Sequence, residues 1–127
     1  MNFQKGRNSV MVVEDDIIVG KLLKHTLTQR GFDVQVVADG RLAISNIQNQ
    51  NPPNLVLLDI LLPFADGFEI LHAIRNQSSW QDVPIVMLTS KTQEASVVRA
   101  FENGANDYVT KPFQVEELMS RIRRLLR

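Results

Sequence analysis

The chain contains no cysteine among its 127 residues, which excludes both a disulfide framework and a thiolate metal site. Its 14 basic and 14 acidic side chains give a formal net charge of zero, which argues against nucleic-acid binding by bulk electrostatics. No apolar stretch approaches the roughly 20 residues that a transmembrane helix needs. We therefore expect a soluble domain of the cytoplasm that binds neither nucleic acid nor membrane directly.

Residues 1–9 form a short polar arm, with Lys5 and Arg7, and lack the apolar core of a signal peptide. We assign residues 10–127 to one domain, because a chain of this length supports a single hydrophobic core and leaves little room for a second. The 44% apolar composition is sufficient for such a core.

Four short apolar runs each end beside a residue type that a phosphoryl-transfer site needs. Residues 10–13 run into Glu14 and Asp15, 55–58 into Asp59, 85–88 into Thr89, and 108–110 into Lys111. Short continuous apolar runs are typical of strands in a parallel sheet that is covered on both faces. Because ligands bind outside the carboxyl ends of parallel strands, we expect these side chains to converge.

Strands and helices are predicted to alternate along the chain. Strands are expected at 10–14, 33–37, 55–59, 85–88 and 107–110. Helical spacing of apolar residues predicts helices from about 16 to 30, from about 40 to a break at 49–53, over 68–74, over 97–101 with an end near 104, and over 115–125. Ile18 and Leu22 belong to the apolar stripe of the first helix, and Leu42 is expected to face inward from the second. Five such units, joined by right-handed crossovers, predict an α/β fold with helices on both faces of the sheet.

The acids at the strand ends suggest a specific chemistry. Glu14, Asp15 and Asp59 would repel one another if they met without a cation, and Mg²⁺ suits such a site because it prefers carboxylate, water and phosphate oxygens. A carboxylate beside Mg²⁺ can attack phosphorus and form an aspartyl phosphate. Charge on the transferring phosphoryl oxygens would be compensated by the Lys111 ammonium and by a hydrogen bond from Thr89.

The order of these motifs resembles that of a response-regulator receiver domain, the CheY-like module of two-component signalling. The resemblance covers residues 10–127 and rests on 12–16, 57–63, 66–67, 87–90, 104–105 and 107–113, which read VVEDD, LLDILLP, DG, MLTS, GA and DYVTKPF. It implies a flavodoxin-like (βα)5 fold with strand order 2-1-3-4-5. It also implies a signalling protein rather than an enzyme, with a sensor histidine kinase or phosphotransfer protein as donor and an output domain or effector protein as target.

The resemblance implies a role for each acid of the site. Asp59 would accept the phosphoryl group. The Mg²⁺ ligands would be Asp59 itself, Asp15, Glu14 through a water molecule, and the backbone carbonyl of Leu61.

It also implies a switch. Lys111 would pair with the phosphate and precede a cis bond to Pro112. Thr89 would move toward the phosphoryl group and Tyr108 would turn inward with it. The face formed by the fourth helix, fifth strand and fifth helix would change as a result.

Several of these residues also have ordinary structural interpretations. Asp15 and Asp16 would cap the helix that follows them, because acids are favoured at helix N-termini. Thr89 would cap the fourth helix, and Tyr108 would be a core aromatic.

The arginines near the C-terminus have two interpretations. They suit the end of a helix through the macrodipole, or they form a homodimer face in which Arg121 pairs with Asp107 of a second copy. The second interpretation follows from DNA-binding response regulators. Val97, Asn103 and Asn106 stand where those proteins carry charged residues, so the ion-pair network would be incomplete.

Two other functions compete with the receiver. A phosphatase of the haloacid-dehalogenase type also uses an aspartate nucleophile, but it needs a second acid two residues later, where this chain has Leu61. A degenerate receiver that only binds partners would be expected to have lost Asp59, Lys111 or the acidic pair, and the chain retains them all.

Overall fold

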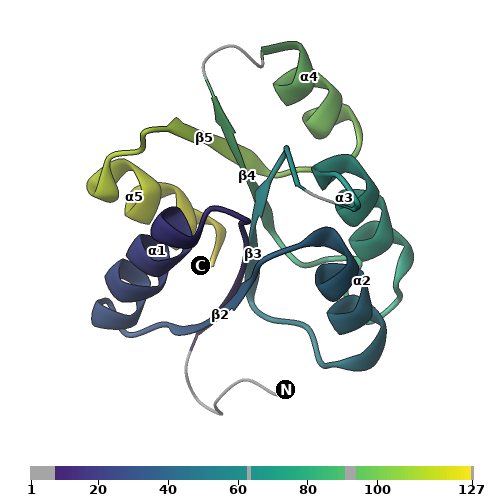
Figure 1. The fold of residues 1–127 in the computed structure, drawn as a ribbon, viewed down its shortest axis with the longest axis horizontal. Coiled ribbons are helices and arrows are strands. Elements are labelled where there is room, and N and C mark those ends of the chain that lie inside the picture. The colour runs from purple at the N-terminus through teal and green to yellow at the C-terminus, as the bar shows by residue number, and fades with distance from the viewer. Residues whose placement is uncertain (1–7, 63, 91–93, 127) are drawn as a thin grey trace.

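The computed structural model describes residues 8–62, 64–90 and 94–126, in which strands and helices alternate (Figure 1). The strands are β1 (Ser9–Val13), β2 (Asp33–Val37), β3 (Leu55–Asp59), β4 (Ile85–Ser90) and β5 (Asp107–Lys111). The helices are α1 (Ile17–Gln29), α2 (Gly40–Asn49), α3 (Gly67–Asn76), α4 (Glu94–Glu102) and α5 (Val115–Leu125). The polar arm predicted over 1–9 lies outside the described residues except for its last two positions.

The strands form one parallel sheet in the order β2-β1-β3-β4-β5, which confirms the flavodoxin-like order 2-1-3-4-5. The chain moves outward from β1 to β2, returns to β3 on the other side of β1, and then continues in the opposite direction. This reversal between β1 and β3 is the topological switch point at which open α/β sheets bind ligands.

Helices cover both faces of the sheet, with α1 and α5 on one side and α2, α3 and α4 on the other (Figure 1). Alternate residues of each strand enter the two cores. On β1, Val10 and Val12 pack with Leu23 and Leu27 of α1. The intervening Met11 and Val13 pack in the second core, which includes residues of α2 and α3. Both faces are therefore apolar, which explains why the strands read as continuous hydrophobic runs.

The buried stripes of the first two helices are narrower than the sequence predicts. On α1, Ile18 is 79% exposed and Leu22 is 49% exposed, whereas Gly20, Leu23 and Leu27 are buried. The inward position expected for Leu42 is wrong, since this side chain is 53% exposed. Gly40, Ala43 and Ile47 provide the buried face of α2 instead. Among the described residues, no helix is both long enough and apolar enough to cross a membrane.

Candidate functional site

The carboxyl ends of β1, β3 and β5 meet at one edge of the sheet. Glu14 follows β1, Asp59 ends β3 and Lys111 ends β5. Lys111 Nζ donates hydrogen bonds to Glu14 Oε2 at 2.8 Å and to Asp59 Oδ2 at 3.2 Å. These three side chains, up to 97 residues apart in sequence, form the base of the candidate site.

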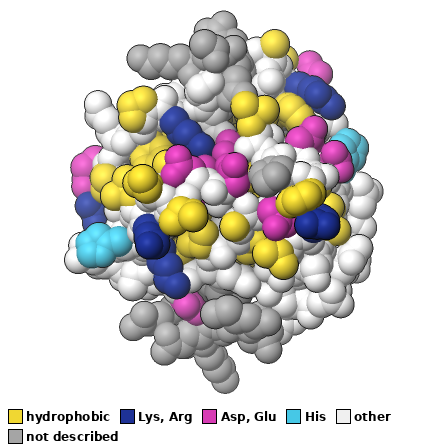
Figure 2. All heavy atoms as spheres, in the orientation of Figure 1, with side chains coloured by type: hydrophobic (Ala, Val, Ile, Leu, Met, Phe, Trp, Pro, Cys, Tyr) yellow, Lys and Arg dark blue, Asp and Glu magenta, His cyan; other side chains and the backbone are white. Residues whose placement is uncertain are grey.

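A cleft of about 340 Å³ opens above this base; its lining residues are Glu14, Asp15, Asp16, Asp59, Leu61, Ser90 and Lys111. In Figure 2, acidic side chains gather near the middle of the molecular face beside hydrophobic ones. The sequence did not predict that Ser90 lines the cleft. The apolar run predicted a strand over 85–88, whereas β4 continues for two more residues and ends at Ser90.

Three carboxylates in the cleft fit a divalent cation. Oxygen atoms of Glu14, Asp15 and Asp59 lie within 4.8 Å of one another. The side chains of Glu14 and Asp59 are only 1% and 10% exposed, whereas Asp15 is exposed to solvent. Hard oxygen donors with one open side are the ligands that Mg²⁺ prefers, because it retains water and accepts a phosphate oxygen.

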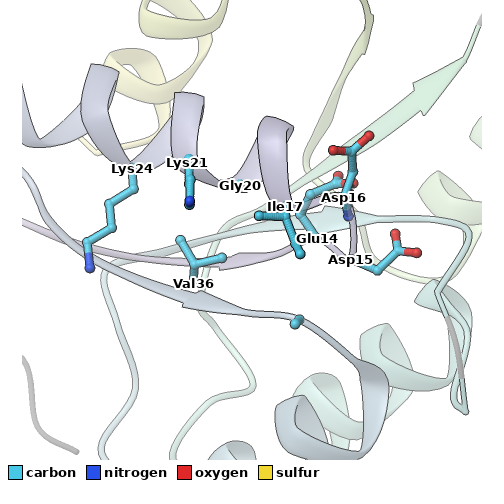
Figure 3. Close-up of a pocket in the computed structure, with 9 residues that line it drawn as sticks. Glu14, Asp15, Asp16, Ile17, Gly20, Lys21, Lys24 and Val36 are labelled. Carbon is cyan, nitrogen blue, oxygen red and sulfur yellow. Dashed lines mark hydrogen bonds between the residues drawn. The ribbon is translucent and has the colours of Figure 1, made fainter.

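Asp15 and Asp16 have different positions at the start of α1. Their carboxylates point in different directions, beside a second groove along α1 (Figure 3). Asp16 Oδ1 accepts hydrogen bonds from the backbone N–H groups of Ile18 at 2.9 Å and Val19 at 3.2 Å. The capping interpretation is therefore confirmed for Asp16, while Asp15 belongs to the acidic group.

Burial and charge perturb the titration of the site. Burial raises the pKa of the Glu14 carboxyl, the hydrogen bond from Lys111 lowers it, and the nearby Asp59 charge raises it again, so that the net shift is upward. Burial lowers the pKa of Lys111, but the hydrogen bond to Glu14 and the charge of Asp59 outweigh it and raise that pKa overall. Lys111 is therefore held as an ammonium between two acids.

Thr89 lies inside β4 rather than at the start of α4, so its interpretation as a helix cap is wrong. Its side chain is buried, and Oγ1 donates to the carbonyl of Ser90 at 3.2 Å. Parallel pairing sets Asp59 beside Leu88, the residue before Thr89. Thr89 is therefore the residue next to the strand partner of Asp59. The movement of its hydroxyl toward a phosphoryl group stays a prediction.

Tyr108 is half-buried and packs against the core that includes α3 residues. Its ring meets Phe101 of α4 edge to face, with centroids 6.0 Å apart, and the guanidinium of Arg121 lies 5.8 Å from its centroid. The ring thus contacts both α4 and α5. Its role as a switch stays a prediction.

Asp107 is buried and bound by two arginines of its own chain. Arg121 Nη1 donates to Asp107 Oδ1 at 2.7 Å, and Arg124 Nη2 donates to Oδ2 at 2.8 Å. The hydrogen bond with Asp107 raises the pKa of Arg121. Sequence reasoning paired Asp107 with Arg121 of a second copy and missed Arg124, because the orientation of α5 over β5 is a tertiary property. The dimer face stays a prediction.

The segment after β3 borders the cleft. The backbone N–H of Leu61 donates to Asp59 Oδ1 at 3.3 Å, while the Leu61 side chain is 67% exposed. A Cβ on Gly67 would lie 2.6 Å from the carbonyl oxygen of Asp59, so only glycine lets α3 approach the backbone of Asp59 so closely. The Lys111–Pro112 bond is cis, as the resemblance implied.

Comparison with known proteins identifies related chains. The family described as "Response regulator receiver domain" matches residues 10–123. MtrA, a DNA-binding response regulator of Mycobacterium tuberculosis, is 41% identical over 121 residues, which are 95% of this chain and 51% of MtrA. The chain spans about half the length of the curated relatives it matches.

Solved structures agree with this relationship. Chemotaxis protein CheY4 of Vibrio cholerae is 32% identical, with a TM-score of 0.88 over 95% of this chain and 100% of that one. The receiver domain of the sensor histidine kinase PA1611 of Pseudomonas aeruginosa is 30% identical, with a TM-score of 0.86 over 95% of this chain and 98% of that one. That receiver has a magnesium ion coordinated in its active-site cleft. In sequence and in fold, the chain therefore belongs to the response-regulator receiver domains of two-component signalling.

Proposed function

We propose that this receiver accepts a phosphoryl group on Asp59 from a sensor histidine kinase or a phosphotransfer protein, with Mg²⁺ as cofactor. The observation that carries the proposal is the contact of Lys111 with both Glu14 and Asp59, at 2.8 and 3.2 Å, beside an open cleft. A lysine held between an acceptor carboxylate and a second acid is an arrangement suited to phosphoryl transfer.

The metal would be held by Asp15, Asp59 and the backbone carbonyl of Leu61, with Glu14 bound through water. Support comes from the 4.8 Å grouping of the carboxylate oxygens and from the magnesium ion in the PA1611 receiver. Bound Mg²⁺ would supply positive charge beside the acceptor and the phosphoryl oxygens.

The side chains of this chain carry out the remaining steps. An oxygen of Asp59 attacks the donor's phosphorus, and an O–P bond forms as the P–N bond of the phosphohistidine breaks with its electron pair left on the imidazole. Lys111 turns its ammonium from the carboxylate to the new phosphoryl group, and Thr89 donates its hydroxyl to another phosphoryl oxygen.

Phosphorylation adds nearly two negative charges, which bias a two-state equilibrium only if they bond better in one state. Thr89 and Lys111 provide those contacts, and Tyr108 transmits the change because it touches α4 and α5. We propose that the altered face of α4, β5 and α5 controls an output domain or a partner protein. Relatives such as MtrA are DNA-binding response regulators, which supports an output of that kind.

A small acyl phosphate with Mg²⁺ tests the proposal by intact mass. A stable gain of one phosphate, abolished by Asp59→Asn and retained by Asp82→Asn, is the expected result; Asp82 is an exposed acid between α3 and β4. Multiple turnover would indicate a phosphatase instead. An unchanged mass would indicate a platform that only binds partners. Equal labelling of the Asp59→Asn variant would reject the acceptor.

A further inference from the structure

Phe64 has an unusual backbone conformation in the segment between β3 and α3. Its φ is 71°, and it is the one non-glycine residue with positive φ in the described part of the chain. Left-handed backbone is unfavourable for a bulky L-residue and is normally occupied by glycine or asparagine. The Phe64 side chain is 68% exposed, so burial of the ring does not account for its presence.

The start of α2 holds this conformation. The Arg41 guanidinium stacks on the Phe64 ring, 3.8 Å from its centroid, as in a cation–π contact. At the preceding residue, a Cβ on Gly40 would clash with the carbonyl oxygen of Ala65. The backbone of Gly40 therefore packs directly on the backbone of Ala65. The first two residues of α2 thus contact both Phe64 and Ala65.

Phe64 and Ala65 belong to the segment after β3, which borders the acidic cleft. At its start, Leu61 N–H donates to Asp59 Oδ1, and at its end, Gly67 N–H donates to the carbonyl of Ile60 at 2.9 Å. Phe64 lies between these two attachments. Leu62 packs against the hydrophobic core, and the contacts of Arg41 and Gly40 with Phe64 and Ala65 fix the described residues that follow it. A segment that is already fixed by a supporting contact loses little conformational entropy when the ligand binds, so the ligand binds more tightly.

We propose that Phe64 is a positioning residue for the divalent cation, locked by Arg41 so that the segment after β3 presents Leu61 to the acidic cleft. Glycine at position 64 would relieve the backbone strain, but it would also remove the aromatic ring that Arg41 contacts. The strain therefore accompanies the contact. This inference rests on the proposed function, because it assigns a task at the same metal site.

The experiment measures Mg²⁺ affinity by titration calorimetry together with the midpoint of thermal unfolding. Phe64→Asn accepts the left-handed backbone but lacks the ring, and Arg41→Ala leaves the ring without its cation. We expect each variant to weaken Mg²⁺ binding at least threefold while the unfolding midpoint of the metal-free protein stays within a few degrees. The double variant should bind Mg²⁺ with the same affinity as the weaker-binding single variant, because both substitutions break the same contact.

Arg123→Ala, at an exposed position of α5, is the matched control and should leave Mg²⁺ affinity unchanged. Affinities of Phe64→Asn and Arg41→Ala equal to that of the unmodified chain would overturn the positioning role alone. Additive losses in the double variant would also overturn it, because the two residues would then act separately. Failure of the unmodified chain to bind Mg²⁺ would overturn the proposed function and this inference with it.

Discussion

At the end of β5, Lys111 holds two acids that would otherwise repel each other. The Glu14 side chain is 1% exposed, so a variant without the ammonium leaves a buried carboxylate with its main partner gone. Removing one member of a buried ion pair costs about 3 kcal/mol. We expect Lys111→Met to lower the free energy of unfolding by about that amount in metal-free buffer, measured by urea denaturation.

The same variant should lose less stability when Mg²⁺ is present, since the cation replaces part of the missing charge. Lys24→Met, which removes an exposed lysine of α1, should change the stability by less than about 0.5 kcal/mol in either buffer. A Lys111→Met protein as stable as the unmodified one without metal would show that the ion pair contributes little to folding.

Residue-scale chemistry was partly predictable from the sequence. Glu14, Asp59 and Lys111 each follow a short apolar run, and parallel strands bring their carboxyl ends to one edge, so their meeting could be expected. The paired arginines on Asp107 could not be expected, because a periodic pattern does not state how a helix is rotated over its neighbouring strand. Nor does sequence reveal the left-handed backbone of Phe64 or its contact with Arg41, a residue of α2 that is remote in the chain.

Among the elements, α3 begins directly against the end of β3, at Gly67. A Cβ there would lie 2.6 Å from the Asp59 carbonyl oxygen and 2.8 Å from the Ile60 Cα, and backbone atoms cannot move aside cheaply. We expect Gly67→Ala to lower the free energy of unfolding by about 1–3 kcal/mol in a denaturant titration.

Gly20 of α1 offers the matched control. A Cβ there would meet only Val36 Cγ1 at 3.2 Å, a side-chain atom that can shift. Alanine is also the better helix former by about 1 kcal/mol, so Gly20→Ala should be neutral or stabilising. Equal destabilisation by the two substitutions would indicate that lost backbone space near Asp59 is not the cause.

Element boundaries were easier to predict than helix faces. The ranges 33–37 and 55–59 match β2 and β3 because turn residues bracket each strand. Ile18 and Leu42 were assigned to apolar stripes, yet both are more than half exposed. Apolar spacing marks a helix, but the width of its buried stripe depends on what packs against it.

For the whole molecule, a cation bound in the acidic cleft would link metal binding to folding. A ligand that binds the folded state alone stabilises it by RT ln(1 + [L]/Kd), which is about 1.4 kcal/mol at ten times Kd. Glu14 and Asp15 follow β1 and Asp59 ends β3, so these three carboxylates meet only when the sheet is assembled. The gain should therefore appear in the unfolding of the entire domain.

We expect saturating Mg²⁺ to raise the calorimetric unfolding midpoint by about 5 °C over the same protein in chelator, as a single transition. Asp15→Asn removes an exposed carboxylate of the proposed cation site and changes no buried side chain, so it should reduce this shift while leaving the metal-free midpoint almost unchanged. Asp82→Asn should retain the full shift, because its carboxylate lies outside the cleft. An equal Mg²⁺ shift in the Asp15→Asn protein would mean that the cation stabilises the fold from somewhere other than the strand ends of β1 and β3.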